Sequence, residues 1–201
     1  HAAFTKRIVQ IAKQFKLGNP GDRATDMGPL ISAKQRERVE SYIQSGLRQG
    51  ATLLYGGKRP RGKQYEQGFF IEPTIFTSVN QRMTIAQEEI FGPVLCVITY
   101  KTVDEAVKQA NDVRYGLAAS VWGTDLTQAM SAARRLRFGT VWINEHGVLV
   151  SEMPHGGFKQ SGFGKDLSLY SFEEFTQIKH IYIDLTHMQR KPWHYTVYGK
   201  P

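Results

Sequence analysis

A carboxylate and an aromatic ring, those of Glu89 and Phe91, come just before a short apolar run at residues 94–98. A carboxylate can accept hydrogen bonds from both hydroxyls of a ribose, and a ring face can lie against a flat heterocycle. Gly92 and Pro93 stiffen the entry to the run, because proline fixes its own φ and moves the preceding residue out of the helical region. The pattern suits a nucleotide, although a solvated acidic helix end beside a core phenylalanine is the commoner arrangement for such residues.

A second group of side chains capable of chemistry lies in residues 144–166, a stretch with five glycines and no periodicity. A loop of that length inside a compact domain is usually functional or disordered. Its polar members include His146, Ser151, Glu152 and His155. Their spacing fits no zinc motif, and Ser151 lacks the Gly-x-Ser-x-Gly elbow of a serine hydrolase. The glycines fail the phosphate-loop spacing, since Gly162 is followed by Phe163, and instead predict positive φ angles and close backbone approach.

Cys96 is the only cysteine, so an internal disulfide is excluded and a reducing cytosol is compatible with the sequence. A catalytic thiolate needs partial exposure and positively charged surroundings. Cys96 instead lies between Leu95 and Val97 in the most apolar part of the chain, which predicts a core residue. We therefore expect a cytoplasmic protein in which Cys96 is not a nucleophile.

The positive charge of the chain, +8 at neutral pH, raises the question of an anionic partner. The bases are scattered, and the one dense cluster, at residues 58–63, sits in a turn rich in glycine and proline. No stripe of bases and no nucleic-acid motif accompanies it, which argues against a nucleic-acid partner. No apolar run is long enough to cross a bilayer and no signal-peptide pattern opens the chain, so we expect no membrane partner.

The first half of the chain predicts two helices and two strands. Apolar residues at helical spacing indicate a helix over residues 4–17. Ser32 and Gln35 form a capping box that opens the second helix. Short strands are expected at residues 51–55 and 69–76, and the proline within the latter run indicates an edge or a bulge.

From residue 94 onward, apolar runs alternate with helical patterns. Strands are expected at residues 94–100, 117–122 and 140–143, separated by helices that begin after Thr102 and Asp125. Such alternation implies parallel strands with right-handed crossovers, and therefore an α/β fold with an open, mainly parallel sheet and helices on both faces. Ligands in such sheets lie beyond the carboxyl ends of strands, where Asn144 is found. Ser171 then caps a short helix, and apolar residues at 178–183 predict a last strand with an exposed edge.

Five stretches, in order along the chain, resemble hallmarks of the aldehyde dehydrogenase superfamily. They are DMGPLIS at 26–32, EEIFGPV at 88–94, NDVRYGLA at 111–118, GTVWIN at 139–144 and PHGGFKQSGFG at 154–164. The likeness covers residues 1–185 and is to the C-terminal part of that family's catalytic domain. Within the family, residues 150–157 look most like the aminoaldehyde branch, which contains the γ-aminobutyraldehyde and betaine aldehyde dehydrogenases.

The resemblance implies a cofactor site for NAD. NADP is an alternative, because the residues that decide between the two cofactors lie outside the matched part of the family. Glu89 would hold the nicotinamide ribose and Phe91 would lie near the nicotinamide ring. Glu88 should point elsewhere. Gln35 and Arg38 match positions that approach the cofactor in the family, although a surface helix face explains them equally well.

The resemblance also implies residues of an aldehyde tunnel in the loop after residue 144: His146, Leu149 and His155, with Gly147 as an alternative to His146 near the mouth. Related enzymes often have an aromatic residue where His155 stands. A cationic aminoaldehyde would favour a carboxylate near the entrance, for which Glu145 and Glu152 are the candidates.

The reaction of the resembled family begins when a cysteine thiolate attacks the aldehyde carbonyl. The thiohemiacetal passes hydride to NAD, and a water activated by a glutamate hydrolyses the thioester. By the order of the motifs, that cysteine, the glutamate and the main nucleotide-binding sheet belong before His1. We therefore expect part of an NAD(P)-dependent aldehyde dehydrogenase that is inactive alone, the alternative being a truncated, non-catalytic relative that serves in assembly.

The same resemblance divides the chain into three parts. Residues 1–175 would belong to the catalytic domain, residues 176–185 would form a strand that joins a neighbouring subunit, and residues 186–201 would be a tail. We expect a homo-oligomer, a dimer or a tetramer, assembled through the 176–185 strand.

Overall fold

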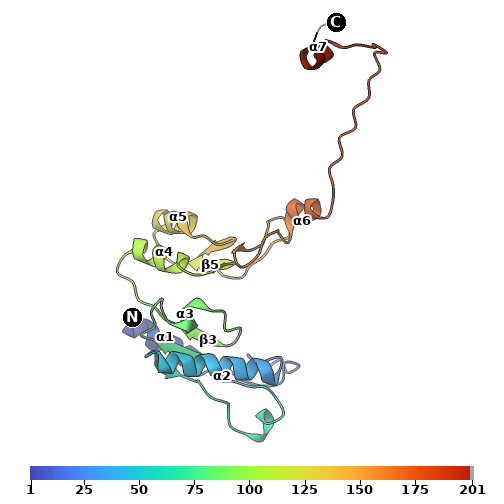
Figure 1. Ribbon diagram of the computed structural model, residues 1–201. Coiled ribbons are helices and arrows are strands. Elements are labelled where there is room, and N and C mark those ends of the chain that lie inside the picture. The colour runs from blue at the N-terminus through green and yellow to red at the C-terminus, as the bar shows by residue number, and fades with distance from the viewer. Residues whose placement is uncertain (200–201) are drawn as a thin grey trace.

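The computed structural model describes residues 1–199, which form two packed parts followed by a long C-terminal extension (Figure 1). The first part contains helices α1 (Ala2–Ala12), α2 (Ala33–Arg48) and α3 (Thr84–Gln87), strands β1 (Thr52–Tyr55), β2 (Thr74–Thr77) and β3 (Val94–Cys96), and the 3-10 helix η1 (Lys63–Tyr65). The second part contains α4 (Val103–Asn111), β4 (Tyr115–Gly116), β5 (Ala118–Val121), α5 (Leu126–Arg135), β6 (Thr140–Ile143) and β7 (Phe158–Lys159). The extension carries α6 (Ser168–Glu174) and α7 (Pro192–Tyr198).

The core of the first part forms between α2 and a three-stranded sheet. β2 is the central strand, antiparallel to β1 and parallel to β3. Val39 and Ile43, one turn apart on α2, are almost fully buried together with Phe76 of β2. An apolar stripe at this spacing is what fixes an amphipathic helix on a sheet. It places α2 beside the residues that lead into β3.

The second part is built on the parallel pair of β5 and β6, whose register runs from Ala118 opposite Thr140 to Val121 opposite Ile143. α4 and α5 pack together, and α5 contacts both strands. A short antiparallel pair, β4 with β7, joins the stretch after β6 to this part. The α/β class and the parallel pairing predicted from the sequence are confirmed.

The strands are divided among three small sheets, whereas the sequence pattern predicts one. Among residues 1–199 β3 and β5 pair neither with each other nor through a shared neighbouring strand, so the chain that leaves β3 and passes through α4 enters separate sheets. The 94–100 run forms a strand only as far as Cys96. The 69–76 run forms a strand only from Thr74, and the predicted irregularity falls instead on β1, between Leu53 and Tyr55.

Three of the predicted helix starts are confirmed. Side-chain oxygens of Ser32, Thr102 and Asp125 each accept a hydrogen bond from the backbone N–H three residues later, at 3.0 to 3.1 Å. In a full capping box the Gln35 side chain would also bind the backbone N–H of Ser32. Here the Gln35 amide instead donates to the carbonyl oxygens of Ile90 and Phe91. The first helix ends earlier than predicted, at Ala12.

The C-terminal extension departs from the sequence-based expectation in two ways. α6 begins at Ser168, so Ser171 lies inside the helix and is not its cap. Residues 176–185 form no strand and run as an extended arm that leads away from the rest of the chain to α7 (Figure 1). A strand needs a neighbour for its hydrogen bonds, and the described part of the chain provides none here. Within residues 1–199 no helix is both long and apolar enough to cross a membrane.

Candidate functional site

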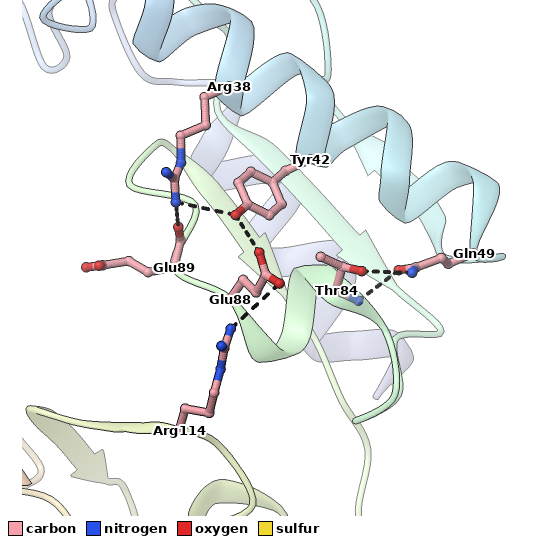
Figure 2. A network of polar contacts seen from close by, with 7 residues as sticks. All are labelled: Arg38, Tyr42, Gln49, Thr84, Glu88, Glu89 and Arg114. Carbon is pink, nitrogen blue, oxygen red and sulfur yellow. Dashed lines mark hydrogen bonds and ion pairs between the residues drawn. The ribbon is translucent and has the colours of Figure 1, made fainter. Parts of the chain in front are cut away.

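The 88–91 turn, which leads into β3, is held by side chains from one face of α2. Gln35 donates from Nε2 to the carbonyl oxygens of Ile90 and Phe91, at 3.1 and 2.8 Å. Arg38, three residues further along the helix, donates from Nη2 to the carbonyl oxygen of Glu89 at 2.8 Å (Figure 2). Two side chains on neighbouring positions of the helix surface therefore fix three successive carbonyl groups.

Glu88 is bound from two directions, as Figure 2 shows. Tyr42 donates its hydroxyl to Oε2 of Glu88 at 2.7 Å, and Nη2 of Arg114 lies 3.6 Å from Oε1. Arg38 donates to the hydroxyl oxygen of Tyr42 at 3.3 Å. The hydrogen bond to Glu88 raises the pKa of Tyr42, and burial raises it further, so Tyr42 remains a donor at neutral pH.

Glu89 and Phe91 are left free by these contacts. The carboxylate of Glu89 points away from Arg38 and Glu88 (Figure 2), and it makes no hydrogen bond within the described residues. Phe91 exposes 74% of its surface and has a φ of 57°, an uncommon conformation for a residue with a side chain. The carbonyl contacts from α2 hold the turn in this conformation. A free carboxylate two residues from an exposed ring fits the ribose and the nicotinamide of NAD.

A separate clamp joins α2 to α3, the helix just before the turn (Figure 2). Gln49 donates from Nε2 to Oγ1 of Thr84 at 2.9 Å, and the backbone N–H of Thr84 donates to Oε1 of Gln49 at 2.8 Å. The second bond satisfies an amide at the start of α3. Both ends of α2 are thus tied to the segment that carries Glu88 and Glu89.

The histidines of the 144–157 loop are both bound to the β5–β6 sheet. Nδ1 of His146 lies 3.1 Å from the hydroxyl oxygen of Ser120, and its ring packs edge-on against Trp142. Nδ1 of His155 lies 2.8 Å from the hydroxyl oxygen of Thr140. Each histidine keeps its Nε2 for another partner.

The other predicted residues of this loop are exposed. Leu149 exposes half of its surface. Glu145 accepts the backbone N–H of His146 through Oε1 at 2.8 Å, and Glu152 is exposed. The side-chain amide of Asn144 is engaged within the fold, because it exchanges two hydrogen bonds with the backbone of Gly123. That contact joins the carboxyl ends of β5 and β6.

The glycine-rich loop, residues 156–164, has the backbone geometry that the sequence predicts. Gly162 and Gly164 have φ angles of 114° and 80°. A Cβ at Gly156 would overlap the carbonyl oxygen of Gly164, and one at Gly139 would overlap that of Gly156. The loop therefore lies directly against the start of β6, which only residues without a side chain allow.

Two side chains that precede or begin the 88–91 turn reach the end of α4. Gln87 donates from Nε2 to the carbonyl oxygen of Asp112 at 2.8 Å. Glu88 forms the ion pair with Arg114. The 112–114 segment is therefore in direct contact with the turn that carries Glu89.

The glycine-rich loop contacts the same segment. Lys159 donates from Nζ to the carbonyl oxygens of Asn111 and Val113, at 3.0 and 3.1 Å. The backbone N–H of Gln160 donates to the carbonyl oxygen of Arg114 at 3.0 Å. A cation at the C-terminus of α4 also complements the helix dipole.

Cys96 is not activated for catalysis. Its thiol lies 3.5 Å from the carbonyl oxygen of Ile85 and packs against the core of the first part. Burial raises the pKa of the thiol to about 11, the direction opposite to that of a nucleophile. No group of three or more potential metal ligands occurs within residues 1–199.

The structure brings Gln35, Arg38, Glu89 and Phe91 together and places His146, Leu149 and His155 in the loop after β6. Within the described residues no hydrogen bond joins Glu89 or Phe91 directly to the 144–157 loop. Sequence reasoning missed Tyr42 and Arg114 as partners of Glu88. For Tyr42 a signal was available, because it lies four residues after Arg38 on the same helix. For Arg114 no local sequence pattern indicates the contact with Glu88, because Arg114 belongs to a different part of the fold.

Comparison with known proteins identifies the family. Residues 1–181 match the model of the aldehyde dehydrogenase family, so this chain belongs to that family. It is 48% identical over 182 residues to the betaine aldehyde dehydrogenase of Bacillus subtilis, a match that covers 90% of this chain and 37% of that protein. It is 44% identical over 182 residues to the betaine aldehyde dehydrogenase of Brucella ovis, with the same coverage.

Solved structures agree with these relatives. The chain matches the betaine aldehyde dehydrogenase of Staphylococcus aureus in complex with NAD+ at a TM-score of 0.88 and 40% identity, over 94% of this chain and 39% of that one. It matches an aldehyde dehydrogenase of Bacillus cereus at a TM-score of 0.87 and 40% identity, over 92% of this chain and 37% of that one. The chain thus spans somewhat more than a third of the length of these relatives.

Proposed function

We propose that this chain supplies the nicotinamide-facing turn and the aldehyde loop of an NAD-dependent aldehyde dehydrogenase that oxidises an aminoaldehyde, such as betaine aldehyde, to the acid. The observation that carries the proposal is the 88–91 turn. Its backbone is fixed by α2 while the Glu89 carboxylate and the Phe91 ring stay free. The relatives named above supply the substrate class and the cofactor.

The chain's own residues would bind and orient the reactants. Glu89 accepts the ribose hydroxyls through its carboxylate, and Phe91 limits where the nicotinamide ring can lie. NAD, when bound, accepts the hydride. Gln35 and Arg38 act on the cofactor through the turn, because their polar groups are engaged with its carbonyl oxygens.

The aldehyde would lie along the 144–157 loop, with His146, Leu149 and His155 as its neighbours. The contacts with Ser120 and Thr140 fix both imidazole rings. Glu145 and Glu152 are the carboxylates that would attract a cationic substrate. Cys96 is a poor nucleophile for the aldehyde, since partial burial raises the pKa of its thiol to about 11 and keeps it protonated, so the nucleophile comes from outside this chain.

The proposed function includes assembly with further copies. Residues 1–175 form the catalytic-domain part, and residues 176–185 are the segment that would join a neighbouring subunit. The arm supports this division, because Ile178, Ile181 and Ile183 are all at least 70% exposed on a segment that pairs with no strand among residues 1–199. A purely assembling, non-catalytic relative is the second candidate, favoured by the same exposed arm.

The test is a chimeric enzyme in which the full chain replaces the matching segment of the Bacillus subtilis betaine aldehyde dehydrogenase. We expect the chimera to reduce NAD when given betaine aldehyde and the isolated chain to show no turnover. Glu89→Ala in the chimera should raise KM for NAD at least about tenfold, because charge-assisted hydrogen bonds to the ribose are lost. A folded chimera without activity would favour the assembling relative, and an unchanged KM in Glu89→Ala would remove Glu89 from the site.

A further inference from the structure

The contacts of Glu88 connect the 88–91 turn with the glycine-rich loop. Tyr42 of α2 donates to one oxygen of Glu88, and the guanidinium of Arg114 lies against the other (Figure 2). The carbonyl oxygen of Arg114 accepts the backbone N–H of Gln160. A continuous series of polar contacts therefore leads from α2 through Glu88 to the loop that follows the predicted aldehyde site.

A second series of contacts runs beside the first. Gln87, next to Glu88, binds the carbonyl oxygen of Asp112, and Lys159, next to Gln160, binds that of Val113. The 112–114 segment is thus bound on one side by the residues that lead into the turn and on the other by the glycine-rich loop. It is the place where the two predicted halves of the site meet.

Hydride transfer requires that the nicotinamide ring and the aldehyde be held at a defined distance, and a displacement of about 1 Å can cost orders of magnitude in rate. Glu89 lies on one of the two elements that the 112–114 segment joins, and His155 comes directly before the other, the glycine-rich loop. We infer that Glu88 and Arg114 are positioning residues that keep the 88–91 turn in register with the glycine-rich loop. The inference rests on the proposed function, since only a cofactor and an aldehyde on these elements give the register a catalytic meaning.

An ordinary surface ion pair is the competing explanation. Both side chains are about half exposed, and pairs of that kind contribute little to stability. The Tyr42 hydroxyl distinguishes this pair, because it holds one oxygen of the Glu88 carboxylate while Arg114 lies against the other. A small effect on stability together with a measurable effect on turnover is therefore the signature of positioning.

The test measures kcat, KM for NAD and the melting temperature of the chimera with Glu88→Gln, Arg114→Gln and both substitutions together. Glutamine keeps the shape of the side chain and removes the charge. We expect each single substitution to lower kcat/KM for NAD about three- to fivefold, the range that an exposed pair supports. The double variant should lose no more than one single variant, since residues that act as a unit are not additive.

Glu40→Gln is the matched control. Glu40 lies on α2, as Tyr42 does, and its carboxylate accepts hydrogen bonds from Arg59 at 2.5 and 2.9 Å. It does not contact the 88–91 turn, so kcat and KM for NAD should stay at the parent values. Wild-type kinetics in both single variants, additive losses in the double variant, or an equal loss in the Glu40→Gln control would each overturn the inference.

Hydrogen exchange in the full 201-residue chain provides a second measurement that does not depend on activity. Glu88→Gln should speed amide exchange both in residues 88–91 and in the glycine-rich loop, and Glu40→Gln in neither. An unchanged glycine-rich loop would overturn the coupling. If the parent chimera were inactive while the coupled exchange was observed, the proposed function would fail and the physical link between the elements would stand.

Discussion

Cys96 shows how a residue that is chemically capable in the sequence becomes inert in the fold. The short strand β3 holds it against the core, and Ile85 offers a carbonyl oxygen to its thiol. Burial alone raises its pKa from 9.0 to about 11. Since the thiolate is the reactive form, the environment and not the residue type makes Cys96 a poor nucleophile.

A thiol reagent measures this directly. At pH 8 the thiolate fraction of a group with a pKa of about 11 is roughly 100-fold below that of a group with a pKa of 9.0, so Cys96 should react with a disulfide reagent about 100-fold more slowly in the native chain than in urea. The native chain also keeps its proton where the unfolded thiol loses it, so the thiol's contribution to stability should decline as the pH rises above 9.0. Equal rates in both states would mean that Cys96 is not buried.

The two side chains that stay free on the 88–91 turn could be found in the sequence more readily than the residues that fix the turn. Glu89 and Phe91 stand in a recognisable motif, and the structure leaves both free. Gln35 and Arg38 also belong to the predicted cofactor site, and their side chains bind the carbonyl oxygens of the turn. The ion pair of Glu88 with Arg114 could not be found, because it depends on how two parts of the fold pack.

At the level of single elements, helix starts were the most predictable feature and strand limits the least. Capping is local chemistry, and the three confirmed N-caps each require only one side chain and one N–H. The length of a strand depends on its neighbours, so the apolar run after Pro93 could not reveal that β3 ends at Cys96. The end of α1 at Ala12 has a similar cause, because the backbone N–H of Lys16 binds the Asp26 carboxylate instead of continuing the helix.

Lys159 offers a test of how an element is anchored. Its ammonium group joins the glycine-rich loop to the end of α4 through two carbonyl oxygens. Lys159→Met keeps much of the side-chain volume and removes both bonds, and it should lower the free energy of unfolding by roughly 1 kcal/mol, or about 2–4 °C in melting temperature. Amide exchange in residues 156–164 should rise.

Lys108→Met is the control for this substitution. Lys108 lies on α4 itself, is exposed and makes no side-chain hydrogen bond within the described residues. The Lys108→Met variant should have the melting temperature of the parent chain. Equal melting temperatures for both variants would show that the Lys159 bonds do not anchor the loop.

For the whole molecule, the alternation of strands and helices predicted the α/β class but not the number of sheets. Periodicity reports which face of each element is buried, and it does not report which strand lies between two others. The strands therefore separate into β1–β2–β3, β4–β7 and β5–β6. Helical spacing also did not show that apolar side chains of α1, among them Phe4 and Ile11, remain exposed within residues 1–199.

The 176–185 arm carries the prediction that concerns the assembly. Ile181 and Ile183 are two residues apart, so in a strand they would lie on one face, and each is about 70% exposed in the single chain. Burying an isoleucine side chain contributes roughly 1.5–3 kcal/mol, and a lysine there would leave a charge in an apolar interface. Light scattering of the chimera with Ile181→Lys and Ile183→Lys should therefore give the monomer mass at concentrations where the parent chimera is an oligomer.

Val197→Lys is the matched control for the arm. It introduces the same charge at another exposed apolar position, on α7 beyond the arm, and should leave the oligomer intact. Loss of the oligomer in the control as well would point to a general effect of added charge on the extension. An oligomer that survives both lysines in the arm would place the subunit contact elsewhere, because an unpaired sheet edge with two charges on its apolar face cannot hold a neighbouring strand.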